Sequence, residues 1–594
     1  MAWSILGILA LCLSYNTFET DAGRRVNLQC GANIMEKKVQ RFGRIDKTIV
    51  VFICVLGLSF ASYDLIVLLF GKATTLFNVR VNDGWRIDES YMYLAGTAKT
   101  VLFDPYLKEH AGSLTLRPTL PTAIFVSIYW LCGKSINVAI FVTHVVPPMV
   151  SCLLLYLITV RLTGSRRYAV FATLLGVGHF VYSAVVIWNS LTGGAFVGIA
   201  GPDLYLLQQF FGNSFGFDEI TAPTQFTRLF SPALTLPFLL APLYLILVNR
   251  RPVVRGFLIA LNLFVYPHHV IILGILEATF WINHRKFPVA GFFLAGLAFA
   301  SIYITQNLIV FLSGSYADVY ARVGVTHKLS TMWFFSTLFI LCATTQLAIA
   351  RKRTGIDDGC YFTIGCALSA ILILVFDMFL IFPQVHLVGL RIYAFLAPIS
   401  LVCLGRQIWT SIPAVINPVV FLLVFASQAY AGWLHRYNYA DFTHNGIAQE
   451  MKVFPSGSVV MTDVQYEIPY ISAVTDKYSY IAYGIVSAAG NDELLQRFAV
   501  LASIYGWDGS RFQGGDWDGL LPVYHWVYHH GVTDAAVGVV GFAKAMDEIR
   551  GKSKCELLTL YQVDFIRFRN APPVDLDMCT KPVSKHFLQV MVKK

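Results

Sequence analysis

Ten long apolar runs fill the middle of this chain and constrain its fold more than any other feature. Most have roughly the 20 residues that a helix needs to cross the hydrocarbon core of a membrane. They are continuous rather than alternating, which favours helices over the strands of a membrane barrel. We therefore expect an all-α polytopic membrane domain. The runs are 48–71, 138–160, 167–189, 230–248, 253–283, 288–313, 330–350, 359–383, 387–405 and 411–433.

The composition excludes a mainly water-soluble protein. Only 13% of the 594 residues are charged and 56% are hydrophobic, whereas soluble domains carry about 25% charged residues. Lipid therefore has to solvate most of the surface. The net charge of +10 lies in loop clusters and not in a basic stripe with interleaved aromatics, so we expect no nucleic-acid partner.

Basic clusters between the runs predict the orientation, because Lys and Arg favour cytoplasmic loops. All of the clusters lie on the cytoplasmic side if two conditions hold. A shorter run, 119–132, has to dip into the membrane without crossing it, and the run 253–283 has to cross it twice. This topology has about 11 transmembrane helices, the N-terminus inside and the C-terminus outside. In the alternative, 119–132 crosses fully and two clusters move outside. The clusters are 37–47, 161–167, 250–251, 285–286, 351–353 and Arg406.

The composition also divides the chain into domains. The N-terminal segment is 1–47. We expect its residues 1–34 to be an upstream extension that precedes the true start at Met35, and a short membrane anchor is the alternative. A transmembrane domain follows, with a large outer loop at 72–118, and then a small soluble α/β domain that we expect to be extracytoplasmic. The ranges are 1–47 (extension 1–34), 48–435 and 436–594.

Short alternating elements in 436–594 predict the α/β character of that domain. A disulfide between Cys555 and Cys579 is expected if the domain faces an oxidising compartment, the alternative being two free thiols. No CxxC or Cys/His metal spacing occurs. The expected elements are strands at Ser458–Thr462, Ala535–Gly541 and Leu557–Phe568, and helices at Glu493–Tyr505 and Phe542–Arg550.

Three acids in the 72–118 loop, Asp83, Asp88 and Glu89, are the strongest candidates for chemistry. An apolar stripe at helical spacing follows them and predicts an amphipathic helix in the membrane interface. A carboxylate at headgroup depth could take a proton from an attacking hydroxyl. An adjacent pair could hold a divalent cation that binds a lipid phosphate. The alternative is that Asp88 and Glu89 only favour the start of the helix.

The acidic pair and the residues after it resemble a known family. Asp88-Glu89, followed by Tyr91, Tyr93, Ala95 and Ala98 beyond the first span, is similar to the first outer loop of the GT-C superfamily of membrane glycosyltransferases. That superfamily includes the protein O-mannosyltransferases and the aminoarabinose transferases. The resemblance implies a GT-C-like fold and the transfer of a sugar from a polyprenyl-phosphate donor to an extracytoplasmic glycan, lipid or protein acceptor.

The same resemblance implies roles for the two acids. Asp88 would be the general base that deprotonates the acceptor hydroxyl. Glu89 would bind the acceptor or a metal ion, Mg²⁺ or Mn²⁺. A single displacement at the anomeric carbon would invert its configuration, without a covalent enzyme intermediate.

Basic side chains at the outer ends of spans are candidates for binding the leaving phosphate. Arg228 lies just before a span, and His268-His269 lies where the 253–283 run reverses. His386 and Arg391 flank the outer start of another span. Together with Asp83 these complete the predicted substrate-binding set, and simple anchoring in the membrane interface is the alternative for the basic side chains at the span ends.

Two other functions stay open. The break at 266–269 is a feature that secondary transporters also show. A non-catalytic or polymerising membrane protein of cell-surface polysaccharide assembly would share the architecture. Whichever of these functions the protein has, we expect it to lie in a bacterial inner membrane.

Overall fold

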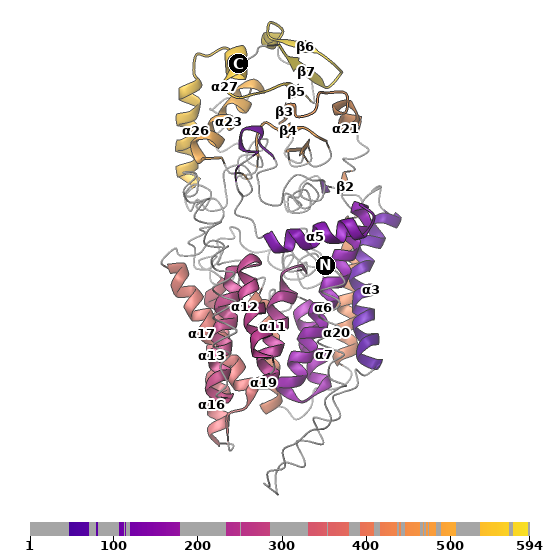
Figure 1. The fold of residues 1–594 in the computed structure, drawn as a ribbon, viewed down its shortest axis with the longest axis vertical. Helices are drawn as coiled ribbons and strands as arrows, with labels where there is room; N and C mark the ends of the chain where they lie inside the picture. Colours follow the sequence, from indigo (N-terminus) through magenta and orange to yellow (C-terminus); the bar gives the residue numbers. More distant parts are fainter. Residues whose placement is uncertain are drawn as a thin grey trace.

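The computed structural model shows a mostly helical molecule with a helix bundle and a smaller C-terminal region that contains a sheet (Figure 1). The residues that it describes are 47–70, 79–80, 106–111, 113, 119–178, 233–249, 251–284, 331–352, 355–378, 392–408, 416–435, 439–440, 446–463, 467–468, 471–472, 475–482, 487, 489–506, 535–568 and 574–591.

Among the described residues, four helices are apolar and long enough to cross a membrane, which indicates a membrane protein. Large apolar side chains point out of the bundle, such as Leu58 and Leu69 of the first helix, which are 64% and 72% exposed. An apolar outer surface of this kind suits contact with lipid and not with water. The four are α3 (Lys47–Phe70), α6 (Ile136–Thr163), α16 (Thr331–Lys352) and α17 (Asp358–Met378).

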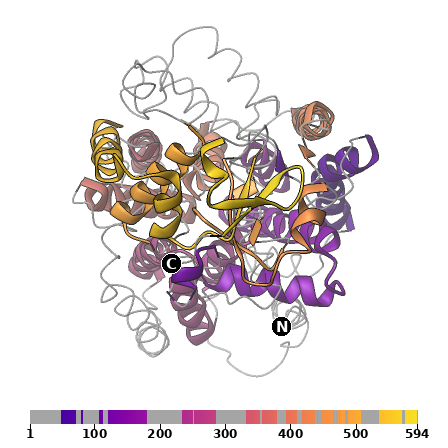
Figure 2. The same cartoon turned by 90° about the horizontal axis from the view of Figure 1, so that it is seen from above.

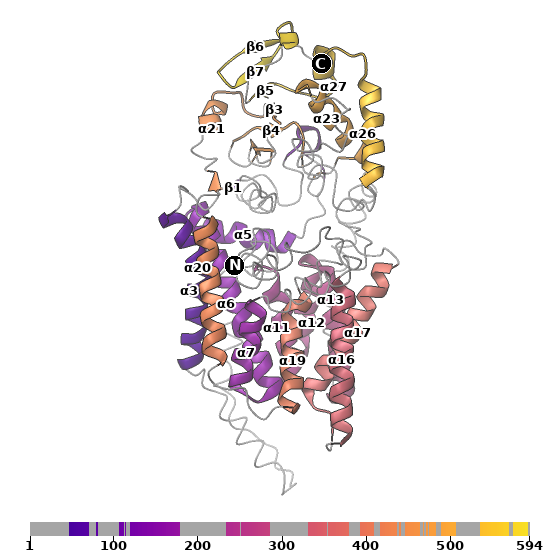
Figure 3. The same cartoon turned by 180° about the vertical axis from the view of Figure 1, so that it is seen from behind.

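The other helices of the bundle have shorter apolar stretches. The predicted count of 11 spans is therefore not confirmed within the described residues, and the run 288–313 lies outside them. In Figure 3, α20 runs along α3 at one side of the bundle. These helices are α7 (Arg166–Val177), α11 (Leu236–Val248), α12 (Pro252–Leu261), α13 (Pro267–His284), α19 (Ala394–Ile408) and α20 (Ile416–His435).

The 253–283 run forms two helices, as predicted. A 3₁₀ turn, η6 (Asn262–Phe264), ends the first, and α13 begins at Pro267. Proline has no N–H to donate within a continuous helix, and its ring favours the first helical turn. The chain therefore breaks at Tyr266-Pro267, beside the two histidines.

Helix α5 (Thr119–Leu131) lies across the end of the bundle at a steep angle to α3 and α6 (Figures 1 and 3). Gly133 and Lys134 follow the helix, and their φ angles of 64° and 62° turn the chain into α6. Whether the run 119–132 dips into the membrane without crossing it or crosses it fully stays a prediction.

The C-terminal region contains a five-stranded mixed sheet in the order β4-β3-β5-β7-β6. β3 is parallel to its neighbours β4 and β5, and β7 is antiparallel to its neighbours β5 and β6. Figure 2 looks down on this region and shows it above the bundle. The strands are β3 (Val459–Met461), β4 (Tyr478–Ser479), β5 (Phe565–Arg567), β6 (Thr580–Pro582) and β7 (Phe587–Val590).

Helices pack around this sheet and give the region its α/β character. The predicted strand at Ser458–Thr462 and helix at Glu493–Tyr505 correspond to β3 and α23. The expected disulfide between Cys555 and Cys579 is formed. The helices are α21 (Gly446–Met451), α23 (Asn491–Ile504), α26 (Ala535–Ile549), α27 (Lys554–Leu560) and the 3₁₀ turn η9 (Val574–Leu576).

One predicted strand of this region is wrong, and another is confirmed only in part. Ala535–Gly541 is the first half of α26, because the helix packs against α23 and Gly541 leaves room for Leu495 there. The strand predicted at Leu557–Phe568 is reduced to β5. Its first residues belong to α27, which begins with a capping box in which Ser553 and Glu556 bond each other's backbone N–H.

The C-terminal region and the bundle share one hydrophobic cluster. It contains the strands β3 and β5, Tyr106 and Leu107 of the 72–118 loop, and Phe125 of α5. A short antiparallel pair, β1 (Val79–Arg80) with β2 (Tyr439–Ala440), adds a second contact. The described residues of the loop after α3 and the C-terminal region therefore lie at the same end of the bundle.

Candidate functional site

A buried arginine of α23 joins the 72–118 loop to the C-terminal domain. Arg497 is fully buried. Its Nε donates to Glu493 Oε1 at 2.8 Å, one helical turn away, and its Nη1 donates to the carbonyl of Tyr480 at 2.9 Å. Its Nη2 lies 3.1 Å from Glu109 Oε2 of the loop. The guanidinium also lies 4.1 Å over the ring of Tyr561, a favourable cation–π position.

The loop side of this contact is the 3₁₀ turn η4 (Lys108–His110). His110 Nε2 lies 2.8 Å from Glu493 Oε2, so Glu493 bonds both Arg497 and the loop. The N–H of Ser479 in β4 donates to the carbonyl of Tyr106 at 3.0 Å. We call residues 106–110 the loop anchor, because ion pairs, a backbone bond and buried apolar side chains all hold them to the domain.

Charges shift the pKa of two groups in the loop anchor contact. Burial alone would raise the pKa of Glu493, but the hydrogen bond from His110 and the charge of Arg497 outweigh it, and the pKa of Glu493 is lowered. Burial would likewise lower the pKa of Arg497, but the carboxylates of Glu109 and Glu493 raise it. The contact is therefore built for a charged arginine between charged carboxylates.

The predicted acids Asp83, Asp88 and Glu89 lie outside the described residues. The described stretches that flank them are β1 and the loop anchor, and both contact the C-terminal part of the chain. Arg228, His386 and Arg391 also lie outside the described residues, as does the apolar stripe after Glu89. The structure thus defines the two flanks of the acidic segment but brings none of these predicted site residues together.

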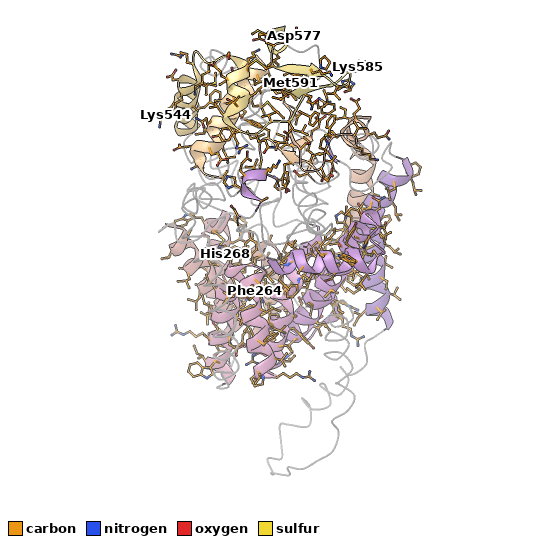
Figure 4. The ribbon with its side chains drawn as sticks, turned by 45° about the horizontal axis from the view of Figure 1, so that its top comes forward. Phe264, His268, Lys544, Asp577, Lys585 and Met591 are labelled. Carbon is orange, nitrogen blue, oxygen red and sulfur yellow. A yellow bond between two sulfur atoms is a disulfide. The ribbon has the colours of Figure 1, made fainter. Side chains whose placement is uncertain are left out.

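His268 and His269 are described, and they are buried at the start of α13, not exposed at a tip. The two residues are only 3% and 2% exposed. Figure 4 shows His268 at the end of the bundle that faces the C-terminal domain. The ring of Tyr266 lies 5.3 Å from that of His268 and 5.8 Å from that of His269.

Asn262 of η6 holds the ring of His269. The Oδ1 atom of Asn262 lies 2.7 Å from His269 Nδ1. The Nδ2 group of Asn262 donates to the carbonyls of Phe238 at 2.9 Å and Leu258 at 2.8 Å. A polar side chain from the helix break therefore orients a buried histidine inside the bundle.

Two buried ion pairs inside the bundle were missed from the sequence. Asp64 of α3 lies 2.7 Å from His144 of α6, and Arg255 of α12 lies 2.6 Å from Glu277 of α13. All four residues are at most 7% exposed. Each is an ionisable residue within an apolar run, which is a signal of function or pairing that could have found them. Both pairs join helices that are neighbours in the bundle.

No group of three or more His, Cys, Asp or Glu side chains that could hold a metal ion exists in the part of the chain that the structure describes. The predicted metal ligand Glu89 is not in that part, so the divalent cation stays a prediction.

Fold and site together define a class: a helical membrane protein whose C-terminal α/β domain is anchored to the loop after the first described helix, α3. Comparison with known proteins does not narrow this class, because no family model and no curated protein matches the chain.

Proposed function

We propose that the protein is a membrane glycosyltransferase that moves a sugar from a polyprenyl-phosphate donor to an acceptor on the extracytoplasmic side. One observation carries the proposal: both described flanks of the acidic segment contact the C-terminal part of the chain. β1 does so through β2, and the loop anchor does so through Arg497. A loop held at both flanks suits a catalytic carboxylate, since misplacement by about 1 Å can lower a rate about 100-fold.

In the proposed reaction, Asp88 removes the proton of the acceptor hydroxyl, which attacks the anomeric carbon. Glu89 binds the acceptor or a divalent cation, and Asp83 contributes to substrate binding. Arg228, His386 and Arg391 stabilise the departing phosphate, because arginine presents paired donors to phosphate oxygens. The configuration of the sugar inverts in this single displacement.

The proposal includes the setting of the reaction. The chain crosses a bacterial inner membrane about 11 times, with the N-terminus inside, and the loop and the C-terminal domain face outward. Bilayer lipid surrounds the bundle, so that the polyprenyl chain of the donor approaches from within the membrane.

The test is sugar transfer by purified protein in lipid nanodiscs. Mass spectrometry of lipid-linked sugars and surface glycans, with and without the protein, first identifies the donor and the acceptor. Asp88→Asn then lowers the transfer rate by about 100-fold or more, since a general base contributes that much. Asp492→Asn, which changes an exposed acid of α23, is the control and keeps the wild-type rate. Undiminished transfer by Asp88→Asn contradicts the proposal.

A secondary transporter is the second candidate, favoured by the helix break and by the two buried ion pairs. Transporters place broken helices and ionisable residues in the middle of the membrane. Reconstituted vesicles separate the two functions. Uptake driven by an ion gradient, without any transfer of sugar, would favour the transporter.

A further inference from the structure

The orientation of the Asn262 side chain is determined by its three neighbours. Two backbone carbonyls, those of Phe238 and Leu258, lie 2.9 and 2.8 Å from its Nδ2 atom. Carbonyl oxygens only accept hydrogen bonds, so the atom that faces them has to be the amide nitrogen. The opposite orientation would place an oxygen against two oxygens. The Oδ1 atom is therefore the one that faces His269.

This orientation in turn determines the proton position on His269. The Oδ1 atom of Asn262, 2.7 Å from His269 Nδ1, only accepts, so Nδ1 has to carry a proton. The ring lies in the first turn of α13, where the helix dipole disfavours a positive charge. The residue is also only 2% exposed, and burial disfavours a charged ring. A neutral ring with a proton on Nδ1 has a lone pair on Nε2.

The Nε2 atom has no structural partner in the described part of the chain, where the hydrogen bond of the ring is the one to Asn262. A shorter side chain with a donor group, such as asparagine, could also donate the hydrogen bond that Asn262 Oδ1 accepts. A histidine adds a second nitrogen, whose lone pair can accept a hydrogen bond from a ligand. The residue lies where the chain breaks, at the end of the bundle that faces the C-terminal domain, as Figure 4 shows for the adjacent His268.

We propose that His269 is a substrate-binding residue whose Nε2 accepts a hydrogen bond from a hydroxyl group of the sugar donor. Asn262 is its positioning residue, which keeps the proton on Nδ1. This inference rests on the proposed transferase function and changes the role expected for His269. A neutral acceptor recognises a hydroxyl group, and the leaving phosphate is left to the arginines.

The first test reads the proton position without any substrate. Protein labelled with ¹⁵N-histidine is reconstituted in lipid, and the His269 signals are assigned by their loss in His269→Asn. The nitrogen spectrum distinguishes a protonated from an unprotonated ring nitrogen. The expected result is a protonated Nδ1 and an unprotonated Nε2 at pH 7. A proton on Nε2, alone or with one on Nδ1, overturns the inference.

The second test separates the two nitrogens with matched variants. Asparagine reaches as far as Nδ1, so His269→Asn keeps the bond to Asn262 and removes the Nε2 acceptor. Glutamine reaches as far as Nε2, so His269→Gln keeps an acceptor there and loses the bond to Asn262. His269→Asn is expected to keep the wild-type Tm and to raise the KM for the polyprenyl-phosphate sugar roughly tenfold. His269→Gln is expected to lower the Tm and to leave the KM closer to that of the wild type.

The outcomes distinguish this inference from the function on which it rests. If the wild type transfers sugar and His269→Asn has an unchanged KM, the inference is overturned and the transferase proposal stands. If both variants lower the Tm equally and leave the KM unchanged, His269 is structural and the inference is again overturned. If the wild type transfers no sugar from a panel of polyprenyl-phosphate hexoses, the proposed function fails, and the substrate role of His269 fails with it.

Discussion

The bundle and the C-terminal domain bury their charged side chains in different ways. In the bundle, the two described buried ion pairs each join two neighbouring helices, as in Arg255 with Glu277. In the domain, Arg497 is shared by Glu493 and Glu109, whose side chains are 24% and 36% exposed. In a fully desolvated pair each charge is stabilised only by its partner, whereas a partly exposed carboxylate is also stabilised by water. The bundle pairs therefore hold helices together, and the domain network connects segments that lie far apart in the sequence.

Breaking a bundle pair has the largest expected effect. Arg255→Met leaves Glu277 as an unpaired carboxylate in an apolar environment, which we expect to lower the free energy of unfolding by about 3–5 kcal/mol. The double variant Arg255→Met with Glu277→Leu removes both charges and recovers most of this loss. Thermal and denaturant unfolding in detergent micelles measure both. A double variant as unstable as the single one would show that the pairing is not the cause.

Breaking the domain network has a smaller and more local effect. Arg497→Met removes its bonds to Glu493, Tyr480 and Glu109, but the carboxylates retain water, so we expect a loss of about 2 kcal/mol. We expect hydrogen exchange of the loop anchor, residues 106–110, to rise and the proposed sugar transfer to slow.

The control for this variant is Arg567→Met. Arg567 lies 2.9 Å from Glu467 in the same domain and has no bond to the loop anchor among the contacts described. This variant should lower domain stability without increasing hydrogen exchange at 106–110. Equal exchange at the loop anchor in both variants would mean that Arg497 has no special role in holding the loop.

Acid has the smallest expected effect, and it is confined to the domain. The pKa of Glu493 lies below its ordinary value of 4.5. Its charge therefore contributes stability that is present above pH 4.5 and is lost as the pH falls through the lowered pKa of the folded state. Denaturant unfolding between pH 3 and 7 measures this loss in the wild type. Glu493→Gln should be less stable at pH 7 and should lack this part of the pH dependence, and an identical pH profile in both proteins would refute the assignment.

The long helices could be predicted from the sequence because hydropathy and length alone determine them. The runs 48–71 and 330–350 match α3 and α16 to within two residues. Within the domain, packing overrides local preference, as in the Val-rich start of α26. Ser553 and Glu556 are a helix start signal that the strand prediction for the following residues overlooked.

The pairing of charges could not be predicted, because it depends on the tertiary fold. Asp64 and His144 are 80 positions apart, and His110 and Glu493 are 383 apart. The apolar runs flag Asp64 as unusual but do not name its partner. The candidate site shows the same limit. The sequence singles out Asp88 and Glu89 by type and place, while the contacts that hold the flanks of their segment come from a domain more than 300 residues later.

Membrane-impermeant maleimide labelling of intact cells tests the central claim most directly. The claim is that the acidic segment and the C-terminal domain share the outer face of the membrane. Single cysteines are introduced as Ser90→Cys in the segment, Lys544→Cys on the exposed face of α26 and Lys352→Cys at the end of α16, and the wild type gives the background. The account predicts that the cysteines at 90 and 544 are labelled in intact cells and that the one at 352 is labelled only after permeabilisation. Labelling at 90 and 544 from opposite sides, or at both only after permeabilisation, would contradict it.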